Sequence, residues 1–247
     1  MRIFPNTKWM GHQLIFFKDI DSSNDTAKSF IQLGKNLSCG SVIIANKQNK
    51  GRGRFQRIWH SPASVNLYFS ILIKPELDQK NWPQMTFPMS LGILEATQKY
   101  SKDVHLKWPN DILVQGKKIC GILLELEKDW VIVGVGYNVN QKEFQAGLHL
   151  PATSLFLETG KQIDRFRILL EILQHIEKWY EYFCKHGFES IREIWIEKSH
   201  LLQRGIVLTD GRHVTVTGLN DDGSLCYMGE DYKKGALYSS DEICSWL

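Results

Sequence analysis

The order of apolar patterns along the chain constrains its fold more than any other sequence feature. Short runs rich in β-branched residues indicate strands, and they lie at 41–45, 65–74, 104–108, 112–114, 119–126 and 130–136. Apolar residues at helical spacing indicate helices at 27–34 and 87–100. A longer apolar stripe between an Asp164 cap and a Gly187 stop predicts a further helix. Strands and helices in this order favour an α+β domain.

The texture of the sequence changes after about residue 202. Short β-branched runs alternate there with the pairs Asp210-Gly211 and Asp222-Gly223, which favour hairpin turns. We therefore expect a small all-β module in the last ~45 residues, in the form of a five-stranded barrel. The predicted organisation is a domain at 1–201 followed by a companion module at 202–247.

Length and composition agree with this organisation and exclude several classes of protein. The chain has 247 residues, of which 43% are hydrophobic and 23% charged, so it is neither disordered nor collagen-like. Its apolar runs are far shorter than the ~20 residues that cross a bilayer, so no membrane partner is expected. The N-terminus lacks the apolar core of a signal peptide, and we expect a cytoplasmic protein. Five cysteines without a C-x-x-C pair indicate neither disulfides nor a zinc site.

The charge is unevenly distributed along the chain. Residues 26–75 hold eight Lys and Arg and no Asp or Glu, whereas the other 22 basic and 27 acidic residues sum to −5. The formal charge of +3 therefore hides one basic region. Such a region is expected where a site handles an anion, although a solvated surface gives the same pattern.

The segment 51–59, with the sequence GRGRFQRIW, lies in this basic region and is the most informative motif. Its two glycines allow backbone N–H groups to approach a ligand, and its three arginines supply planar, permanently charged donors that suit phosphate. Trp59 adds a flat face that can stack on a nucleobase. The segment is neither a Walker A loop nor G-x-G-x-x-G. An RNA-binding arginine-glycine segment is the competing interpretation, but such segments are usually repetitive, and this one lies between apolar strands.

Two further groups of residues, at 107–125 and 134–140, could carry chemistry. Asn110 and Asp111, after a Pro, can hydrogen-bond a purine or ribose, can hold a metal-bound water, or can simply form an Asx turn. Lys118 enters an apolar strand, so it is either an anion-binding catalyst or a snorkelling surface lysine, and Gly121 after it allows a close approach. The glycines of 134–140 suit either a ligand or a strand-end turn. No hydrolase triad, H-E-x-x-H motif or persuasive carboxylate pair is visible.

Together these motifs resemble those of the biotin protein ligases, which adenylate biotin and transfer it to a lysine of a carboxyl carrier domain. The resemblance rests on five motifs in family order: DSSN at 21–24, GRGRxxRxW at 51–59, KWPND at 107–111, KxxGIL at 118–123 and GxGxN at 134–138. It implies a monofunctional ligase with a class II synthetase-like catalytic domain and an SH3-like C-terminal module.

The resemblance also implies roles for particular residues. Biotin would contact Ser22, Ser23, Asn24, Gln48, Arg52, Gly53, Arg54, Lys118, Gly121 and Gly134. ATP would contact Arg54, Arg57, Trp59, Asn110, Asp111, Lys118 and Asn138. The catalytic set would be Lys118, Arg52 and Arg54 acting with Mg²⁺, whose protein ligands the motifs do not identify.

The sequence departs from the family pattern at two places. Ser23 stands where the family commonly has Thr, which keeps the hydroxyl group. Phe55-Gln56 stands where Arg-Gly is common, and this removes a charge and a flexible hinge from the adenylate-binding loop. The loop is expected to be disordered in the empty enzyme and to close over the ligand.

Two alternatives and the expected partners complete the interpretation. A lipoate or octanoate ligase is the closest alternative enzyme, and the arginine-rich loop disfavours it. A nucleic-acid-binding regulator is suggested by the basic region, but the stretch before the first expected strand near Gln13 is too short for a helix-turn-helix module of ~60 residues, so no DNA partner is expected. The expected partner is the biotin carboxyl carrier domain of a carboxylase, and the expected state is a monomer or weak homodimer.

Overall fold

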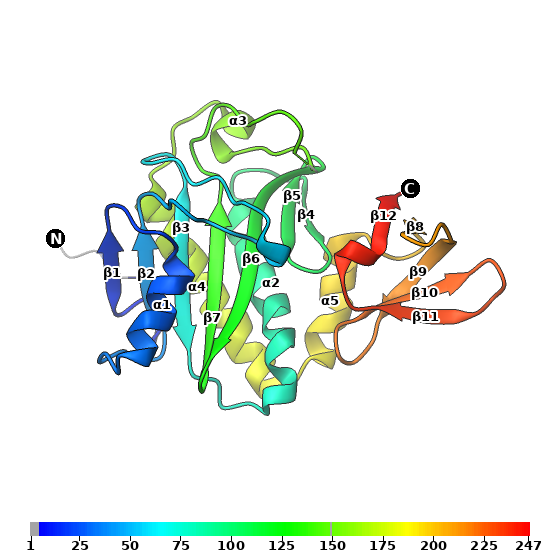
Figure 1. The fold of residues 1–247 in the computed structure, drawn as a ribbon, viewed down its shortest axis with the longest axis horizontal. Coiled ribbons are helices and arrows are strands. Elements are labelled where there is room, and N and C mark those ends of the chain that lie inside the picture. Colours follow the sequence, from blue (N-terminus) through cyan, green and yellow to red (C-terminus); the bar gives the residue numbers. More distant parts are fainter. Residues whose placement is uncertain (1–4, 149) are drawn as a thin grey trace.

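The computed structural model describes residues 5–148 and 150–247 and has two β-sheets with helices packed around the larger one (Figure 1). The large sheet has the strand order β1-β2-β3-β7-β6-β5-β4, with β1 parallel to β2 and the other neighbours antiparallel. Its strands are β1 (Leu14–Phe17), β2 (Ser41–Ala45), β3 (Leu67–Ile73), β4 (Val104–Lys107), β5 (Asp111–Val114), β6 (Lys117–Glu127) and β7 (Trp130–Tyr137). The predicted strands of the first 140 residues are therefore present.

Helices lie on both faces of this sheet and around its ends (Figure 1). They are α1 (Ser23–Gln32), α2 (Thr86–Gln98), α3 (Leu155–Thr159), α4 (Arg165–His186) and α5 (Glu189–Ser199). Side chains alternate along a strand, so β2 sends Val42 and Ile44 into the large core shared with α2 and α4, and Ile43 into a smaller cluster beneath α1. The surface under α1 is the face that carries the predicted site.

The longest helix, α4, ends where its sequence predicts. The Asp164 carboxylate accepts hydrogen bonds from the backbone N–H groups of Phe166 and Arg167 and so caps the helix N-terminus. Gly187 ends the helix with φ 77°, a conformation that glycine adopts without strain. No helix in the described ranges is long and apolar enough to cross a membrane.

The last strands form a second sheet with the order β11-β10-β9-β8-β12. They are β8 (Gly205–Leu208), β9 (His213–Leu219), β10 (Leu225–Gly229), β11 (Lys234–Leu237) and β12 (Ile243–Trp246). Both Asp-Gly pairs lie in the connections between strands, and Gly211 and Gly223 have positive φ, as the turn prediction requires. This five-stranded sheet is consistent with the predicted SH3-like module. The boundary at 201/202 stays a prediction.

The small sheet packs against the large domain through polar and apolar contacts. The indole N–H of Trp108, just after β4, donates to the carbonyl oxygen of Gly223 at 3.0 Å, and the Gln84 amide donates to that of Asp221 at 2.7 Å. A Cβ added at Gly223 would lie 2.6 Å from the Phe87 ring, so this turn packs directly on α2. The end of β4 is thereby held next to the C-terminal sheet.

Candidate functional site

The start of α1 brings hydrogen-bonded polar side chains together over the middle of the large sheet, and we call this set the polar pocket: Ser22, Ser23, Asn24, Gln48, Ser70 and Glu125. Ser22 caps the helix, its hydroxyl accepting from the backbone N–H of Asp25 at 3.4 Å. The Ser70 hydroxyl lies 2.7 Å from that of Ser23 and 2.6 Å from the Asn24 amide oxygen. Gly134 lies beneath the same amide, and a Cβ there would come within 2.4 Å of the oxygen. Glycine is thus required at this position by the packing of α1.

Gln48 joins this pocket to the glycine-arginine segment. Its amide oxygen accepts from the backbone N–H of Ser23 at 2.8 Å, and its amide nitrogen donates to the Ser61 hydroxyl at 3.1 Å. Ser61 donates in turn to the carbonyl oxygen of Trp59 at 3.0 Å. Ser22, Ser23, Asn24, Gln48 and Gly134, which were predicted to contact biotin, therefore lie together. Hydroxyl and amide groups in this arrangement suit a neutral, hydrogen-bonding ring.

The segment 51–59 folds as a short hairpin with a 3₁₀ turn at its tip. The N–H of Gly53 donates to the Arg57 carbonyl at 2.8 Å, and that of Trp59 donates to the Gly51 carbonyl at 2.9 Å. At the tip, Phe55 and Gln56 have φ of 55° and 59°. These are the two positions at which the sequence departs from the family pattern, and both adopt a conformation that L-residues other than Asn and Asp rarely take. The predicted disorder of this segment stays a prediction.

Arg52 is the most strongly paired residue of this hairpin. Its two terminal nitrogens each donate to an oxygen of Asp25 at 2.6 Å, and one of them also lies 3.1 Å from Glu125. Glu125 accepts further hydrogen bonds from Lys28 and Asn24, both at 2.7 Å. Burial by itself would raise the pKa of Glu125, but these donors and the charge of Arg52 outweigh it and the pKa is lowered.

The Trp59 indole ring packs against the large sheet over two glycines. Gly121 of β6 pairs with Gly136 of β7, so two positions without a Cβ lie side by side. A Cβ at Gly136 would come within 2.3 Å of the indole ring, and one at Gly121 within 3.2 Å. The indole nitrogen is buried without a hydrogen-bond partner among the described residues. The predicted stacking residue can therefore pack closely on the sheet because two neighbouring interior strands, β6 and β7, have no side chain at these positions.

Lys118 lies beside this ring and next to Asp111. Its ammonium nitrogen is 5.3 Å from the Trp59 ring centre and 2.7 Å from an Asp111 oxygen. That oxygen lacks hydrogen-bond geometry, so the contact is an ion pair with poor alignment. Both side chains are partly buried, which weighs against a lysine that merely snorkels to solvent. Lys118 thus remains available to a better-aligned anion.

Asn110 and Asn138 are occupied by the fold itself. The Asn110 amide donates to the Ile122 carbonyl at 2.6 Å, and the Asn138 amide donates to the Thr153 carbonyl at 3.0 Å. Asn138 is 4% exposed. The nucleotide contacts predicted for both residues stay predictions, and these hydrogen bonds indicate that each residue also shapes the site.

Further cations gather where β4 meets the C-terminal sheet, and two of them, Lys107 and Arg204, were not among the predicted site residues. We call this set the junction cluster: Arg54, Arg57, Lys107, Lys118 and Arg204. Lys107 and Arg204 lie over the Trp246 ring at 5.9 and 5.1 Å, and Arg57 is ion-paired with Asp241 at 2.5 Å. The motif KWPND contained Lys107, but only the fold could reveal its neighbours.

Two members of the junction cluster carry charge that the described residues do not neutralise by contact. Burial lowers the pKa of Arg54, against the attraction of the more distant Asp241 and Asp111. Burial also lowers the pKa of Lys107, against Asp111, and the neighbouring cations Lys118 and Arg204 lower it further. Neither side chain forms an ion pair within the described part of the chain. Partly buried cations without counter-ions are typical of surfaces that bind anions.

Some functional residues were missed although the sequence carried a signal for them. Ser70 is fully buried and is the one serine in the strand LYFSILI, whose other residues are aliphatic or aromatic. Glu125 is a carboxylate within the largely apolar strand KKICGILLELE. A polar side chain inside a strand that is otherwise apolar requires partners, and here those partners belong to the pocket.

Metal binding at the site would depend on His, Cys, Asp and Glu side chains. Within residues 5–148 and 150–247, no group of three or more His, Cys, Asp or Glu side chains is placed to hold one. Asp111 is the carboxylate closest to Lys118. This set fits a Mg²⁺ held mainly by a nucleotide's phosphates with at most one protein carboxylate, which is a usual arrangement for Mg²⁺.

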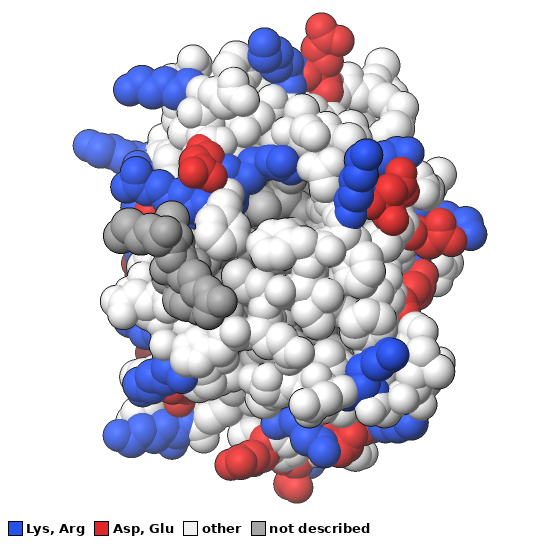
Figure 2. Space-filling view, turned by 90° about the vertical axis from the view of Figure 1, so that its left-hand side faces the viewer, with Lys and Arg blue, Asp and Glu red and all other residues white. Residues whose placement is uncertain are grey.

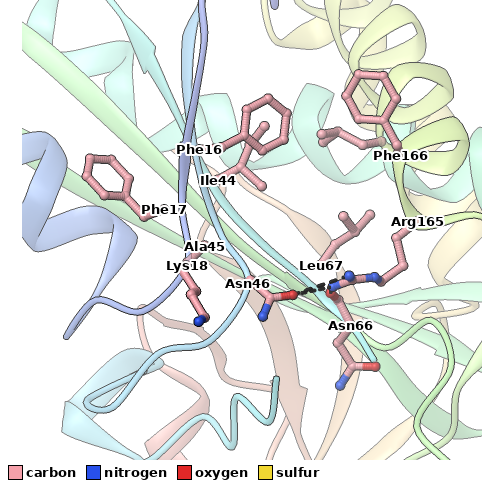
Figure 3. A pocket seen from close by; sticks show the side chains of 11 residues that line it. Phe16, Phe17, Lys18, Ile44, Ala45, Asn46, Asn66, Leu67, Arg165 and Phe166 are labelled. Carbon is pink, nitrogen blue, oxygen red and sulfur yellow. Dashed lines mark hydrogen bonds between the residues drawn. The ribbon is translucent and has the colours of Figure 1, made fainter. Parts of the chain in front are cut away.

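Two hollows lie away from these residues. A cavity of about 370 Å³ opens between β1, β2 and the start of α4, where Arg165 donates to Asn46 and Phe16 and Phe166 form its apolar wall (Figure 3). The edge of the molecule at β1 presents a broad face of uncharged side chains with Lys and Arg toward its border (Figure 2). A second cavity of about 680 Å³ lies beside Glu177. No predicted site residue lines either cavity.

Comparison with known proteins identifies the family. An alignment with the bifunctional ligase/repressor BirA of Bacillus subtilis has 33% identity over 255 residues and covers 98% of this chain and 77% of the relative. The chain belongs to the biotin protein ligases. The model of the biotin/lipoate A/B protein ligase family matches residues 16–138, which contain all five motifs. The biotin–[acetyl-CoA-carboxylase] ligase of Paracoccus denitrificans is 28% identical and is covered over 91% of its length, against 85% of this chain.

Solved structures of biotin protein ligases share the fold. The Aquifex aeolicus enzyme in complex with biotin and ATP has a TM-score of 0.81 and 33% identity, with 94% of this chain and 97% of that chain covered. Its apo form has a TM-score of 0.77 and 30% identity, covering 92% and 96%. The match extends over nearly the whole of both chains, so it includes the C-terminal sheet. The resemblance inferred from the motifs is confirmed at the level of family and fold.

Proposed function

We propose that this protein activates biotin with ATP to form biotinyl-5′-AMP and then transfers the biotinyl group to a lysine of a biotin carboxyl carrier domain. The observation that carries the proposal is the position of Lys118. Lys118 is the member of the junction cluster that adjoins Gly121 and Trp59, and its strand, β6, pairs with β7, which carries Gly134 beneath the polar pocket. A neutral ring and a polyphosphate can thus bind on either side of one lysine.

The polar pocket would take the biotin head group. The hydroxyl groups of Ser23 and Ser70 and the amides of Asn24 and Gln48 supply both donors and acceptors, which a ureido ring requires. Apolar residues of the sheet surround them, so an unmatched ligand would leave buried polar groups unpaired. This penalty supports biotin, whose ureido group has donors and an acceptor, over the dithiolane ring of lipoate or the plain acyl chain of octanoate.

The junction cluster would take the triphosphate. In the first step a biotin carboxylate oxygen attacks the α-phosphorus, the new P–O bond forms, and the bond to pyrophosphate breaks, with the electron pair leaving on pyrophosphate. Two anions must meet, so Lys118, Arg54 and Lys107 would stabilise the charge that develops on the phosphoryl oxygens and the leaving group. Bound Mg²⁺ would neutralise further phosphate charge.

The second step needs no nucleophile from this chain. The acceptor lysine, as a neutral amine, attacks the acyl carbon of the mixed anhydride, an amide bond forms, and AMP leaves while the amine loses a proton. The anhydride must be kept from water until then, which the hairpin 51–59 can do by covering the ligand. The carrier domain, the cytoplasmic location and the monomeric or weakly dimeric state are parts of the same proposal.

The test is biotin-dependent exchange of labelled pyrophosphate into ATP, measured in parallel with biotin, lipoate and octanoate. We expect exchange with biotin alone, and exchange with lipoate or octanoate but not biotin would refute the proposal. Lys118→Ala should reduce the exchange rate by at least about a hundredfold, the usual effect of losing a charge that stabilises the transition state. Lys117→Ala is the matched control, because Lys117 is the exposed neighbour at the start of β6 and should leave the rate unchanged.

A further inference from the structure

Four charged side chains form a closed cluster between α1, the hairpin 51–59 and β6. Asp25 and Lys28 come from α1, Arg52 from the hairpin and Glu125 from β6. Arg52 meets Asp25 through two parallel hydrogen bonds of 2.6 Å and meets Glu125 at 3.1 Å, and Lys28 meets Glu125 at 2.7 Å. Two positive and two negative groups therefore neutralise one another.

This pairing distinguishes Arg52 from the other arginine of the motif. Arg54 forms no ion pair among the described residues, whereas both terminal nitrogens of Arg52 are engaged by carboxylates. The hydrogen bond to Asp25 and the charges of Glu125 and Asp25 raise the pKa of Arg52 further above its ordinary value, although burial acts against them. A guanidinium so paired has little net charge to offer a substrate carboxylate.

Glu125 also belongs to the polar pocket. One of its oxygens accepts from the Asn24 amide at 2.7 Å, and the Asn24 amide oxygen accepts from Ser70 at 2.6 Å. The orientation of the pocket amide and the anchoring of the hairpin are thus fixed by one carboxylate. Breaking either contact would leave a partly buried charge without its partner.

We infer that Arg52 is a tether and that Asp25 and Glu125 are positioning residues, which together hold the hairpin 51–59 against the biotin pocket. The inference rests on the proposed function, because the pocket and hairpin are those proposed to bind biotin and its adenylate. In this arrangement Arg54, Lys107 and Lys118 bind the anions. Arg52 keeps its bidentate contact with Asp25 throughout the reaction. The cluster determines how often the hairpin is closed.

The direction of one kinetic change separates this inference from its rival. If Arg52 instead bound the biotin carboxylate, Asp25 would be a competitor for it in the empty site. Asp25→Asn would then free Arg52 and lower the KM for biotin. If Arg52 is a tether, the same substitution loosens the hairpin and raises the KM.

The experiment measures biotin-dependent pyrophosphate exchange and tryptic cleavage within the hairpin. For Asp25→Asn we expect the KM for biotin to rise about tenfold, with a smaller change in kcat, because a charge-assisted bidentate pair is lost. Trypsin should cut after Arg52, Arg54 or Arg57 faster in this variant than in the wild type. The KM for biotin of Asp25→Glu should lie between those of the wild type and Asp25→Asn. The KM of Arg52→Lys should rise as much as that of Asp25→Asn, because an ammonium group cannot form the paired contact.

Asp129→Asn is the matched control, since Asp129 forms an exposed ion pair with Lys74 at 2.5 Å away from the site. It should change neither the KM nor the cleavage rate. A KM for biotin that falls or stays constant in Asp25→Asn, or a hairpin cleaved no faster, overturns the inference. Absence of biotin-dependent exchange in the wild-type protein would instead refute the proposed function, so the two failures are distinguishable.

Discussion

The Trp59 ring lies on the backbone of Gly136, so closely that a Cβ at 136 would come within 2.3 Å of the indole. The neighbouring Gly121 leaves room for the far edge of the same ring. A rigid indole cannot yield as a flexible side chain would, so these two glycines set where the predicted nucleotide-stacking surface lies.

Gly136→Ala should therefore displace Trp59 and weaken nucleotide binding. We expect the KM for ATP to rise at least about tenfold, since base–aromatic stacking contributes ~1–3 kcal/mol. The KM for biotin should change much less, and pyrophosphate-exchange kinetics with each substrate varied will show the difference. A melting temperature measured alongside will separate this effect from a general loss of packing. An unchanged KM for ATP would remove Trp59 from the nucleotide site.

Gly134→Ala, two residues earlier on the same strand, should instead weaken the binding of biotin and leave that of ATP nearly unchanged. The new methyl group would press on the Asn24 amide oxygen, 2.4 Å away, and would disturb its hydrogen bond from Ser70. We expect the KM for biotin to rise about tenfold or more while the KM for ATP stays within about twofold. Titration calorimetry with biotin alone provides an independent check. If both variants impaired the same substrate, the assignment of pocket and junction to separate ligands would be wrong.

The parts of the fold that depend on nearby residues were predictable from the sequence. The apolar stripe, Asp164 cap and Gly187 stop of α4 are local signals, and the helix begins and ends beside them. The two Asp-Gly turns of the C-terminal module were predictable for the same reason. The closure of these five strands into a barrel stays a prediction, because closure depends on how the first and last strands meet, which no local pattern encodes.

The site was predictable only where a motif contains it. The motif DSSN together with Gln48 predicted most of the polar pocket. The glycines beneath Trp59 also lie within the motifs. Lys107, Arg204 and Trp246 belong to different elements, and only the packing of the C-terminal sheet beside β4 brings them together. The pairing of Arg52 was hidden for a similar reason, because Asp25 and Glu125 are 100 residues apart in the sequence.

Lys107→Met should raise the stability of the protein and weaken its binding of ATP. Burial lowers the pKa of Lys107, so the charged form costs free energy in the fold; that cost is fully present below the folded-state pKa, hence at pH 7, and vanishes above the unfolded-state pKa. We expect a melting temperature higher by about 2–4 °C, which ~1 kcal/mol produces in a chain of this size.

The same variant should raise the KM for ATP at least about tenfold, because an unpaired cation is lost from the triphosphate surface. Lys117→Met, at an exposed position, is the control and should change neither quantity. A Lys107→Met variant that is both less stable and fully active would show that Lys107 is a structural residue. Differential scanning fluorimetry and exchange kinetics on the same preparations decide the matter.

The cluster around Arg52 should give stability a defined pH dependence. The hydrogen bond from Arg52 lowers the pKa of Asp25 below its ordinary 3.8, and in Glu125 the donors Lys28 and Asn24 overcome burial to lower the pKa below 4.5. A carboxylate with a lowered folded-state pKa contributes stability that is present above its unfolded-state pKa and is lost as the pH falls through the folded-state value. The contribution should therefore be constant from about pH 6 to 8, begin to fall as the pH approaches the ordinary values of 4.5 and 3.8, and continue to fall below them.

Urea unfolding of the wild type and of an Asp25→Asn/Glu125→Gln double variant across this range will measure that contribution. We expect the wild type to be more stable at pH 7 by about 2–4 kcal/mol, since breaking a partly buried charge network costs several kcal/mol before solvent screening reduces it. The gap should narrow steadily as the pH is lowered, because protonation removes from the wild type the same charges that the substitutions remove. A gap that persists undiminished at pH 3 would mean that side-chain shape and packing, and not charge, account for the effect of the two carboxylates.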